Sequence, residues 1–179
     1  YYNALSWDVV WAKASLTPES AHTWQVPIRP YGVNMTLANA VKAYKPKRLV
    51  ITLGANAVAV MTEDYFISTY EELVKKVKEN SPETQVIVQS IFPVDIRWDT
   101  YANTNNSINN TKINRLNYKL AEMCERQEVK FLNTAEVLKD SSGRLENNLG
   151  YTSDGIHLLP SGNSKVVEYI RTHAYIEGE

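Results

Sequence analysis

The stretch Leu49-Val50-Ile51-Thr52-Leu53-Gly54-Ala55-Asn56 decides the fold class of this chain. Its first five residues are apolar on both faces, which is typical of a parallel strand covered by helices on both sides of a sheet. Gly54 then permits a sharp turn, and Asn56 follows at the carboxyl end of the strand. Similar runs predict three further buried strands, at residues 9–12, at residues 86–88 continuing to 91–92, and at residues 129–132.

Helical patterns fill the sequence between these strands. Thr36 can cap a helix that ends before Pro46, and Thr62 can cap a longer helix that runs to about residue 79. A third helix carries an apolar stripe that includes Cys124, which we expect to be an inert core thiol, and a fourth begins at Pro160. Strands that alternate with helices predict an α/β fold with a mostly parallel sheet. We expect one domain over residues 1–179, because no linker or internal repeat divides the chain.

Composition excludes several classes of function. The 179 residues carry 19 basic and 20 acidic side chains, a net charge of −1, which argues against nucleic-acid binding through a broad basic field. The longest apolar run, residues 49–61, is shorter than the roughly 20 residues of a membrane span. The opening Tyr-Tyr-Asn has no basic n-region, so we expect no signal peptide and interpret the sequence as a mature or trimmed fragment. A single cysteine excludes an intramolecular disulfide and leaves the compartment open.

Residues 95–110 form a polar, Asn-rich stretch without a clear helical or strand pattern. Connections of that length are uncommon inside a domain unless they cover or line a binding site. Trp98 and Tyr101 provide apolar anchors within it, so we expect a loop that packs over a pocket.

Asn56 is the first candidate for chemistry. In open α/β sheets, ligands bind beyond the carboxyl ends of the strands, where Asn56 lies. Its side-chain NH₂ can stabilise a developing oxyanion. The alternative is a structural role as the cap of an Asx-type turn.

The second candidate is the run Ser153-Asp154-Gly155-Ile156-His157-Leu158, just before the last helix. An Asp three residues before a His can bring its carboxylate to the imidazole Nδ1, which fixes the tautomer and leaves Nε2 free to act as a base. The alternative is that Asp154 only caps the turn and His157 is a hydrogen-bonded loop residue. His22 and His173 have no comparable neighbours, so we interpret both as structural or surface residues.

Together these blocks resemble those of the SGNH hydrolases, also called the GDSL esterase family. The family's Asp-x-x-His block is matched by Asp154-Gly155-Ile156-His157, and its Gly-x-Asn block by Gly54-Ala55-Asn56, in the family's order. The resemblance extends over nearly the whole chain, through residues 49–56, 86–93, 129–135 and 154–160. It implies a three-layer α/β/α, flavodoxin-like fold and a serine hydrolase of esters. In that family a serine attacks the acyl carbon; the resemblance makes His157 the base, Asp154 its orienting carboxylate and Asn56 an oxyanion donor.

Two departures from the family pattern affect these assignments. The Gly-Asp-Ser block is absent; Ser15 mimics its serine, but residues 9–14 align better with the family's second strand. On that alignment Ser15 replaces the usual Gly of the second block and can still donate its backbone N–H to the oxyanion, while the nucleophile is expected upstream of Tyr1. Gly32 is a rival for that N–H, although it is also explained as a turn glycine. Ala57 stands where many members carry Asp, which puts local support of the loop in doubt.

The sequence therefore predicts an ester hydrolase for small acyl esters, acetylated glycans included, with the chain inactive without its nucleophile. One alternative is a non-catalytic relative that works as a binding or scaffold domain. Another is an unrelated flavodoxin-like ligand-binding domain, disfavoured because no Gly-x-Gly-x-x-Gly loop follows any strand. The sequence implies no cofactor, metal, nucleic-acid partner or membrane span, and is silent on oligomeric state.

Overall fold

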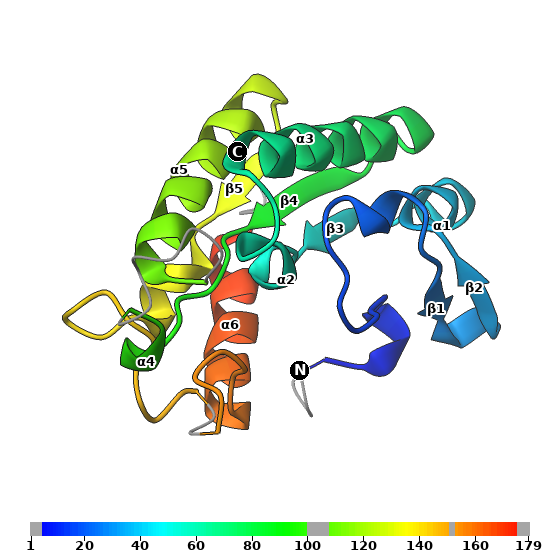
Figure 1. Ribbon diagram of the computed structural model, residues 1–179. Coiled ribbons are helices and arrows are strands. Elements are labelled where there is room, and N and C mark those ends of the chain that lie inside the picture. Colours follow the sequence, from blue (N-terminus) through cyan, green and yellow to red (C-terminus); the bar gives the residue numbers. More distant parts are fainter. Residues whose placement is uncertain (1–4, 100–107, 151–152, 175–179) are drawn as a thin grey trace.

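A parallel sheet of three strands, β3 (Arg48–Ile51), β4 (Gln85–Gln89) and β5 (Lys130–Leu132), lies between helices (Figure 1). The strand order is β3-β4-β5, so β4 is central and β3 pairs with β4 alone among the described residues. The structure is a computed structural model, and it describes residues 5–99, 108–150 and 153–174. The predicted strands at 49–53, 86–88 and 129–132 are thus present, with small differences at their ends.

Helices cover both faces of this sheet. On one face, Val86 and Val88 pack with residues of α3 (Glu63–Asn80) and α5 (Asn110–Arg126). On the other face, Ile87 and Leu132 pack with α6 (Pro160–His173). The chain therefore has the three-layer α/β/α arrangement that the sequence predicted.

The helix caps follow the sequence closely. Thr36 precedes α1 (Leu37–Tyr44), and Thr62 precedes α3 and accepts a hydrogen bond from the Tyr65 N–H. Pro160 is the first residue of α6. Cys124 is buried on the apolar stripe of α5, and burial raises the pKa of its thiol to about 12, as expected of an inert core cysteine.

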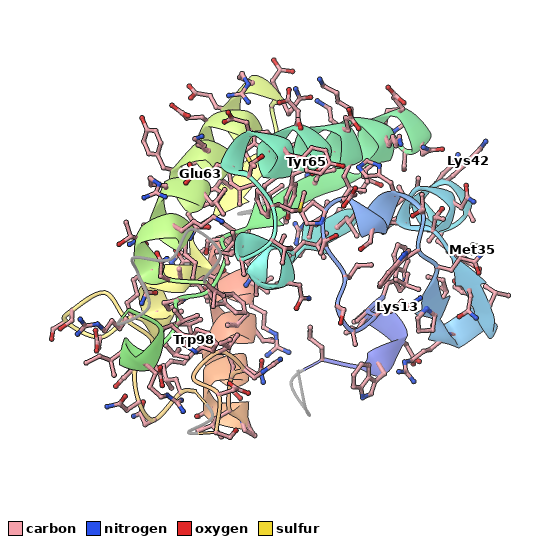
Figure 2. All side chains as sticks on the ribbon, in the orientation of Figure 1. Lys13, Met35, Lys42, Glu63, Tyr65 and Trp98 are labelled. Atoms are coloured by element: carbon pink, nitrogen blue, oxygen red, sulfur yellow. The ribbon has the colours of Figure 1, made fainter. Side chains whose placement is uncertain are left out.

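An ion-pair cluster joins the two helices on the same face of the sheet. Figure 2 labels Glu63, which is the first residue of α3. Its carboxylate lies 2.8 Å from Arg115 and 3.3 Å from Lys119 of α5. Partial burial acts to raise the pKa of Glu63, but the hydrogen bonds and charges of the two cations outweigh it and hold that pKa below the ordinary value.

The remaining elements are short. An antiparallel hairpin, β1 (Val26–Ile28) and β2 (Val33–Met35), was not predicted, because its strands have three residues each and β1 contains Pro27. The other short elements are η1 (Trp7–Val9), η2 (Ser20–His22), η3 (Arg29–Tyr31), α2 (Ala55–Val58), α4 (Ile96–Asp99) and η4 (Thr134–Leu138).

Two sequence predictions of strand are wrong. Residues 9–12 form no strand: Val9 ends η1 and residues 10–12 have no regular structure, since no described strand lies beside them to supply a ladder of hydrogen bonds. Residues 91–92 do not continue β4, because the side chain of Asn117 binds the Ile91 backbone instead. Its Oδ1 accepts from the Ile91 N–H at 2.8 Å, and its Nδ2 donates to the Ile91 carbonyl at 2.9 Å.

The edge of β3 away from β4 is open along an apolar groove. The groove has a volume of about 340 Å³. Residues 48–53, the segment that contains Trp11, and Val167 and Ile170 of α6 line it. Leu49, Val50 and Leu53 are only half-buried, whereas the apolar residues of central β4 are fully buried. The sequence pattern of β3 is that of an inner strand, yet in the described part of the chain it lies at an edge.

None of the helices in the described part of the chain has the length and apolar character needed to cross a membrane.

Candidate active site

A cavity of about 1020 Å³ opens at the carboxyl edge of the sheet. Residues 52–56 after β3, residues 90–92 after β4, and the segment from Ser153 to Leu158 line it together. It therefore brings Asn56, Asp154 and His157 into one cleft, in the position where parallel α/β sheets bind ligands. It adjoins the groove along β3, with which it shares Trp11, Leu16 and Leu53 among its lining residues.

Asp154 and His157 are joined by a hydrogen bond within one tight turn. The His157 Nδ1 lies 2.9 Å from the Asp154 Oδ2, and Asp154 Oδ1 accepts from the N–H groups of Ile156 at 2.7 Å and His157 at 2.9 Å. Partial burial acts to raise the pKa of Asp154, but these backbone and side-chain donors outweigh it and hold that pKa below the ordinary value. Asp154 is therefore a carboxylate over the neutral pH range and favours the His157 tautomer with its proton on Nδ1.

Asn56 lies in the first turn of α2, directly after the turn at Gly54. The backbone of Gly54 has φ +140°, and a Cβ there would collide with the side chain of Ile91, so both conformation and space require glycine. The Asn56 Nδ2 donates to the Leu16 carbonyl at 3.2 Å. An amide NH₂ carries two hydrogens, so this bond orients the group and leaves the second for a ligand in the cavity.

Ser15 lies next to the cleft but does not contribute to its described lining. Its neighbours Lys13 and Leu16 do line the cavity. Ser15 has φ +60°, a left-handed backbone conformation that glycine adopts most readily, in agreement with its alignment to a usual glycine position. Gly32 follows η3 in the hairpin region, and it lines neither the cavity nor the groove.

No hydroxyl or thiol of residues 5–99, 108–150 or 153–174 forms a hydrogen bond with the Nε2 of His157. Ser90 does line the cavity, but it is buried and its Oγ accepts from the Ala135 N–H at 2.9 Å. The described part of the chain thus brings a histidine bound to a carboxylate and a side-chain amide to one cavity, and none of its serines is hydrogen-bonded to that histidine.

The other two histidines lie away from this cleft. His22 Nε2 lies 2.9 Å from the Thr69 carbonyl, and His173 stacks on Tyr169 of the same helix. Both have the structural or surface character predicted. In the described ranges no three His, Cys, Asp or Glu side chains are grouped to hold a metal ion.

Trp98 contributes a contact that sequence reasoning missed. We expected it to anchor a loop over a pocket, and it does line the cavity, as does Ile108; Tyr101 lies outside the described residues. In addition, its indole Nε1 donates to the Asp154 carbonyl at 2.7 Å. Its partner is 56 residues away, so local spacing gave no signal for this bond.

Comparisons with known proteins agree with the fold described above. The sequence model of the GDSL-like Lipase/Acylhydrolase family matches residues 19–165. No curated protein matches the sequence significantly.

Among solved structures, a GDSL-like lipase from Bacteroides thetaiotaomicron is similar at TM-score 0.58 and 22% identity, over 72% of this chain and 62% of that one. A carbohydrate esterase family 3 protein from Talaromyces cellulolyticus is similar at TM-score 0.64 and 16% identity, over 89% of this chain and 67% of that one. A Streptococcus pneumonia protein described as a platelet activating factor is similar at TM-score 0.65 and 19% identity, over 77% of this chain and 68% of that one. At these identities the likeness shows a shared fold. The chain spans only about two thirds of the length of these structures.

Proposed function

The chain belongs to the GDSL-like lipase/acylhydrolase family, and from this premise we propose that it carries the base and an oxyanion donor of a serine esterase for small acyl esters. One observation carries the proposal. The Asp154–His157 pair, joined at 2.9 Å, lines the same cavity as the amide of Asn56. A base and an amide donor around one cleft are the two groups that acyl transfer to a serine needs besides the nucleophile.

The proposed chemistry assigns one role to each group. Asp154 holds the His157 ring with Nδ1 protonated, so that Nε2 takes the proton from an attacking serine hydroxyl and later returns it to the departing alkoxide. The free N–H of Asn56 donates to the oxyanion of the tetrahedral intermediate. The backbone N–H of Ser15 is a second donor in this proposal, and its left-handed conformation supports that alignment.

We further propose that the nucleophile comes from a strand outside residues 1–179 that occupies the groove along β3. The Lys47 carbonyl accepts from the Gln85 N–H, and successive residues of a strand alternate in direction, so the main-chain groups of Val50 and Thr52 face the open edge. A strand parallel to β3 would pair with them and end beside the cavity, which adjoins the groove. The residue after that strand would then lie near the Nε2 of His157.

The substrate class is the finer part of the proposal. The cavity has apolar walls that suit a small acyl group, including Ile91, Ile108 and Leu158. Similarity to a carbohydrate esterase family 3 structure supports acetylated glycans among the candidate esters.

Hydrolysis of an activated acetyl ester by the full-length protein tests the proposal. We expect His157→Ala to lower kcat/KM by at least ~100-fold, the lower range for loss of a general base. Asp154→Asn should also be severe, because an amide can favour the wrong tautomer of the histidine. His173→Ala is the matched control and should leave the rate unchanged.

We expect residues 1–179 alone to be inactive, since none of the residues that the structure describes is a nucleophile hydrogen-bonded to the Nε2 of His157. Equal rates for wild type and His157→Ala would contradict the proposal. A full-length protein that folds but hydrolyses no ester would support the alternative, a non-catalytic binding domain.

A further inference from the structure

The turn that carries Asp154 and His157 is held from outside by a second segment of the chain. Trp98 Nε1 donates to the Asp154 carbonyl at 2.7 Å, and the Asp95 N–H donates to the Gly155 carbonyl at 3.0 Å. Both donors belong to the segment that follows β4 and enters α4. Two consecutive carbonyls of the turn are therefore bound to one separate segment.

That segment is itself firmly anchored. The Val94 backbone is bound at both its N–H and its carbonyl by the side chain of buried Asn110 of α5, at 3.0 and 2.8 Å. The side chain of Trp98 is half-buried and packs against the main hydrophobic core. A donor on a large, packed ring is held in place with little freedom, so it can fix the position of the group it binds.

We propose that Trp98 is a positioning residue, whose indole N–H holds the Asp154 main chain and thereby keeps the Asp154 carboxylate on His157. The inference rests on the proposed function, because that function gives the Asp154–His157 pair its role. The carbonyl and the carboxylate belong to the same residue, and both carboxylate oxygens are already engaged within the turn. Movement of the main chain at Asp154 therefore moves the carboxylate relative to the imidazole.

Trp98→Phe separates this role from simple packing, because it keeps an aromatic ring and removes the donor. We expect kcat for an activated acetyl ester to fall on the order of 10-fold, the effect of one hydrogen bond, with KM nearly unchanged. A wall that only contacts substrate would raise KM instead. Trp7→Phe is the matched control: Trp7 is exposed, lies in η1 and does not line the cavity.

A second measurement does not depend on activity. The pKa of the Asp154 carboxyl, followed by carbon NMR, should rise toward its ordinary value in Trp98→Phe and stay depressed in Trp7→Phe, because a loosened turn weakens the N–H donors that depress it. If Trp98→Phe fails to fold, a benzothiophene analogue of tryptophan at this position removes the N–H at nearly constant ring size. An unchanged Asp154 pKa in Trp98→Phe or in the protein with the benzothiophene analogue at position 98, or a change in KM alone, would overturn the inference.

The two proposals can fail separately. A shifted Asp154 pKa in a full-length protein that hydrolyses no ester would support the positioning role of Trp98 and refute the esterase. Hydrolysis that depends on His157 but is unaffected by Trp98→Phe would support the esterase and refute the positioning role of Trp98.

Discussion

Replacement of Gly155 by alanine should damage the candidate active site far more than it damages the fold. Gly155 lies between Asp154 and Ile156 in the turn and has φ +66°. A Cβ there would meet the Asp95 carboxylate much closer than the 3.0 Å below which real Cβ contacts essentially do not occur. Asp95 cannot easily turn aside, because Arg97 binds its Oδ2 at 2.6 Å and its Oδ1 accepts from the Arg97 N–H at 3.0 Å.

The magnitude follows from these distances. An ordinary van der Waals contact begins at 3.4 Å, so the turn and the Asp95 carboxylate must separate by about 1 Å. A misplacement of about 1 Å in a catalytic group can cost on the order of 100-fold in rate. The left-handed backbone adds roughly 1–2 kcal/mol of destabilisation for any residue with a Cβ.

Gly32→Ala isolates the backbone part of this effect. Gly32 has nearly the same φ, +63°, but a Cβ there meets nothing within 4 Å. We expect both variants of the full-length protein to lose stability in urea unfolding, and only Gly155→Ala to lose kcat by about 100-fold. A folded Gly155→Ala variant with wild-type kcat would refute the reasoning, and so would a loss of kcat in Gly32→Ala equal to that in Gly155→Ala.

Three further outcomes follow from the same structure. Asn56→Ala should lower kcat for an activated acetyl ester by roughly 100–1,000-fold with little change in KM, because an oxyanion donor acts in the transition state; a change confined to KM would contradict this role. Asn117→Ala leaves both main-chain groups of Ile91 buried without partners, at about 1–3 kcal/mol each, and should lower the free energy of urea unfolding by about 2–6 kcal/mol. The same change at exposed Asn114 should cost little, and equal losses of stability in the two variants would contradict this prediction. The pKa of Glu63 is lowered in the fold, so the contribution of its carboxylate to stability is complete above the ordinary pKa of 4.5 and is lost as the pH falls through the lowered pKa. The difference in unfolding free energy between wild type and Glu63→Gln should therefore shrink from pH 7 to pH 3, and a constant difference would refute this prediction.

The sequence predicted the elements that local periodicity and caps determine. Apolar spacing and a capping threonine identify α3, and the uninterrupted apolar run of β4 identifies a central strand. The strand expected at residues 9–12 failed for a non-local reason: a β-branched segment becomes a strand only when another strand pairs with it. The end of β4 was misplaced because Asn117, 26 residues later, binds the Ile91 backbone.

For the candidate site too, the sequence predicted the local contacts and missed the contacts between distant segments. A three-residue spacing is enough to bring Asp154 onto His157, because one turn of chain spans it. The cleft that these two share with Asn56 follows from the position of each after a strand or before a helix. The bonds from Trp98 to Asp154 and from Asn56 to Leu16 join segments 56 and 40 residues apart, and they depend on packing that no local pattern encodes.

The central claim is that His157 activates a serine that residues 1–179 do not supply. Labelling of the full-length protein with a fluorophosphonate, followed by mass-spectrometric mapping of the modified peptide, tests it most directly. We predict an adduct on a serine outside residues 1–179 that disappears in His157→Ala, and no adduct on residues 1–179 alone. An adduct on Ser15, or on any other serine within residues 1–179, would contradict the account.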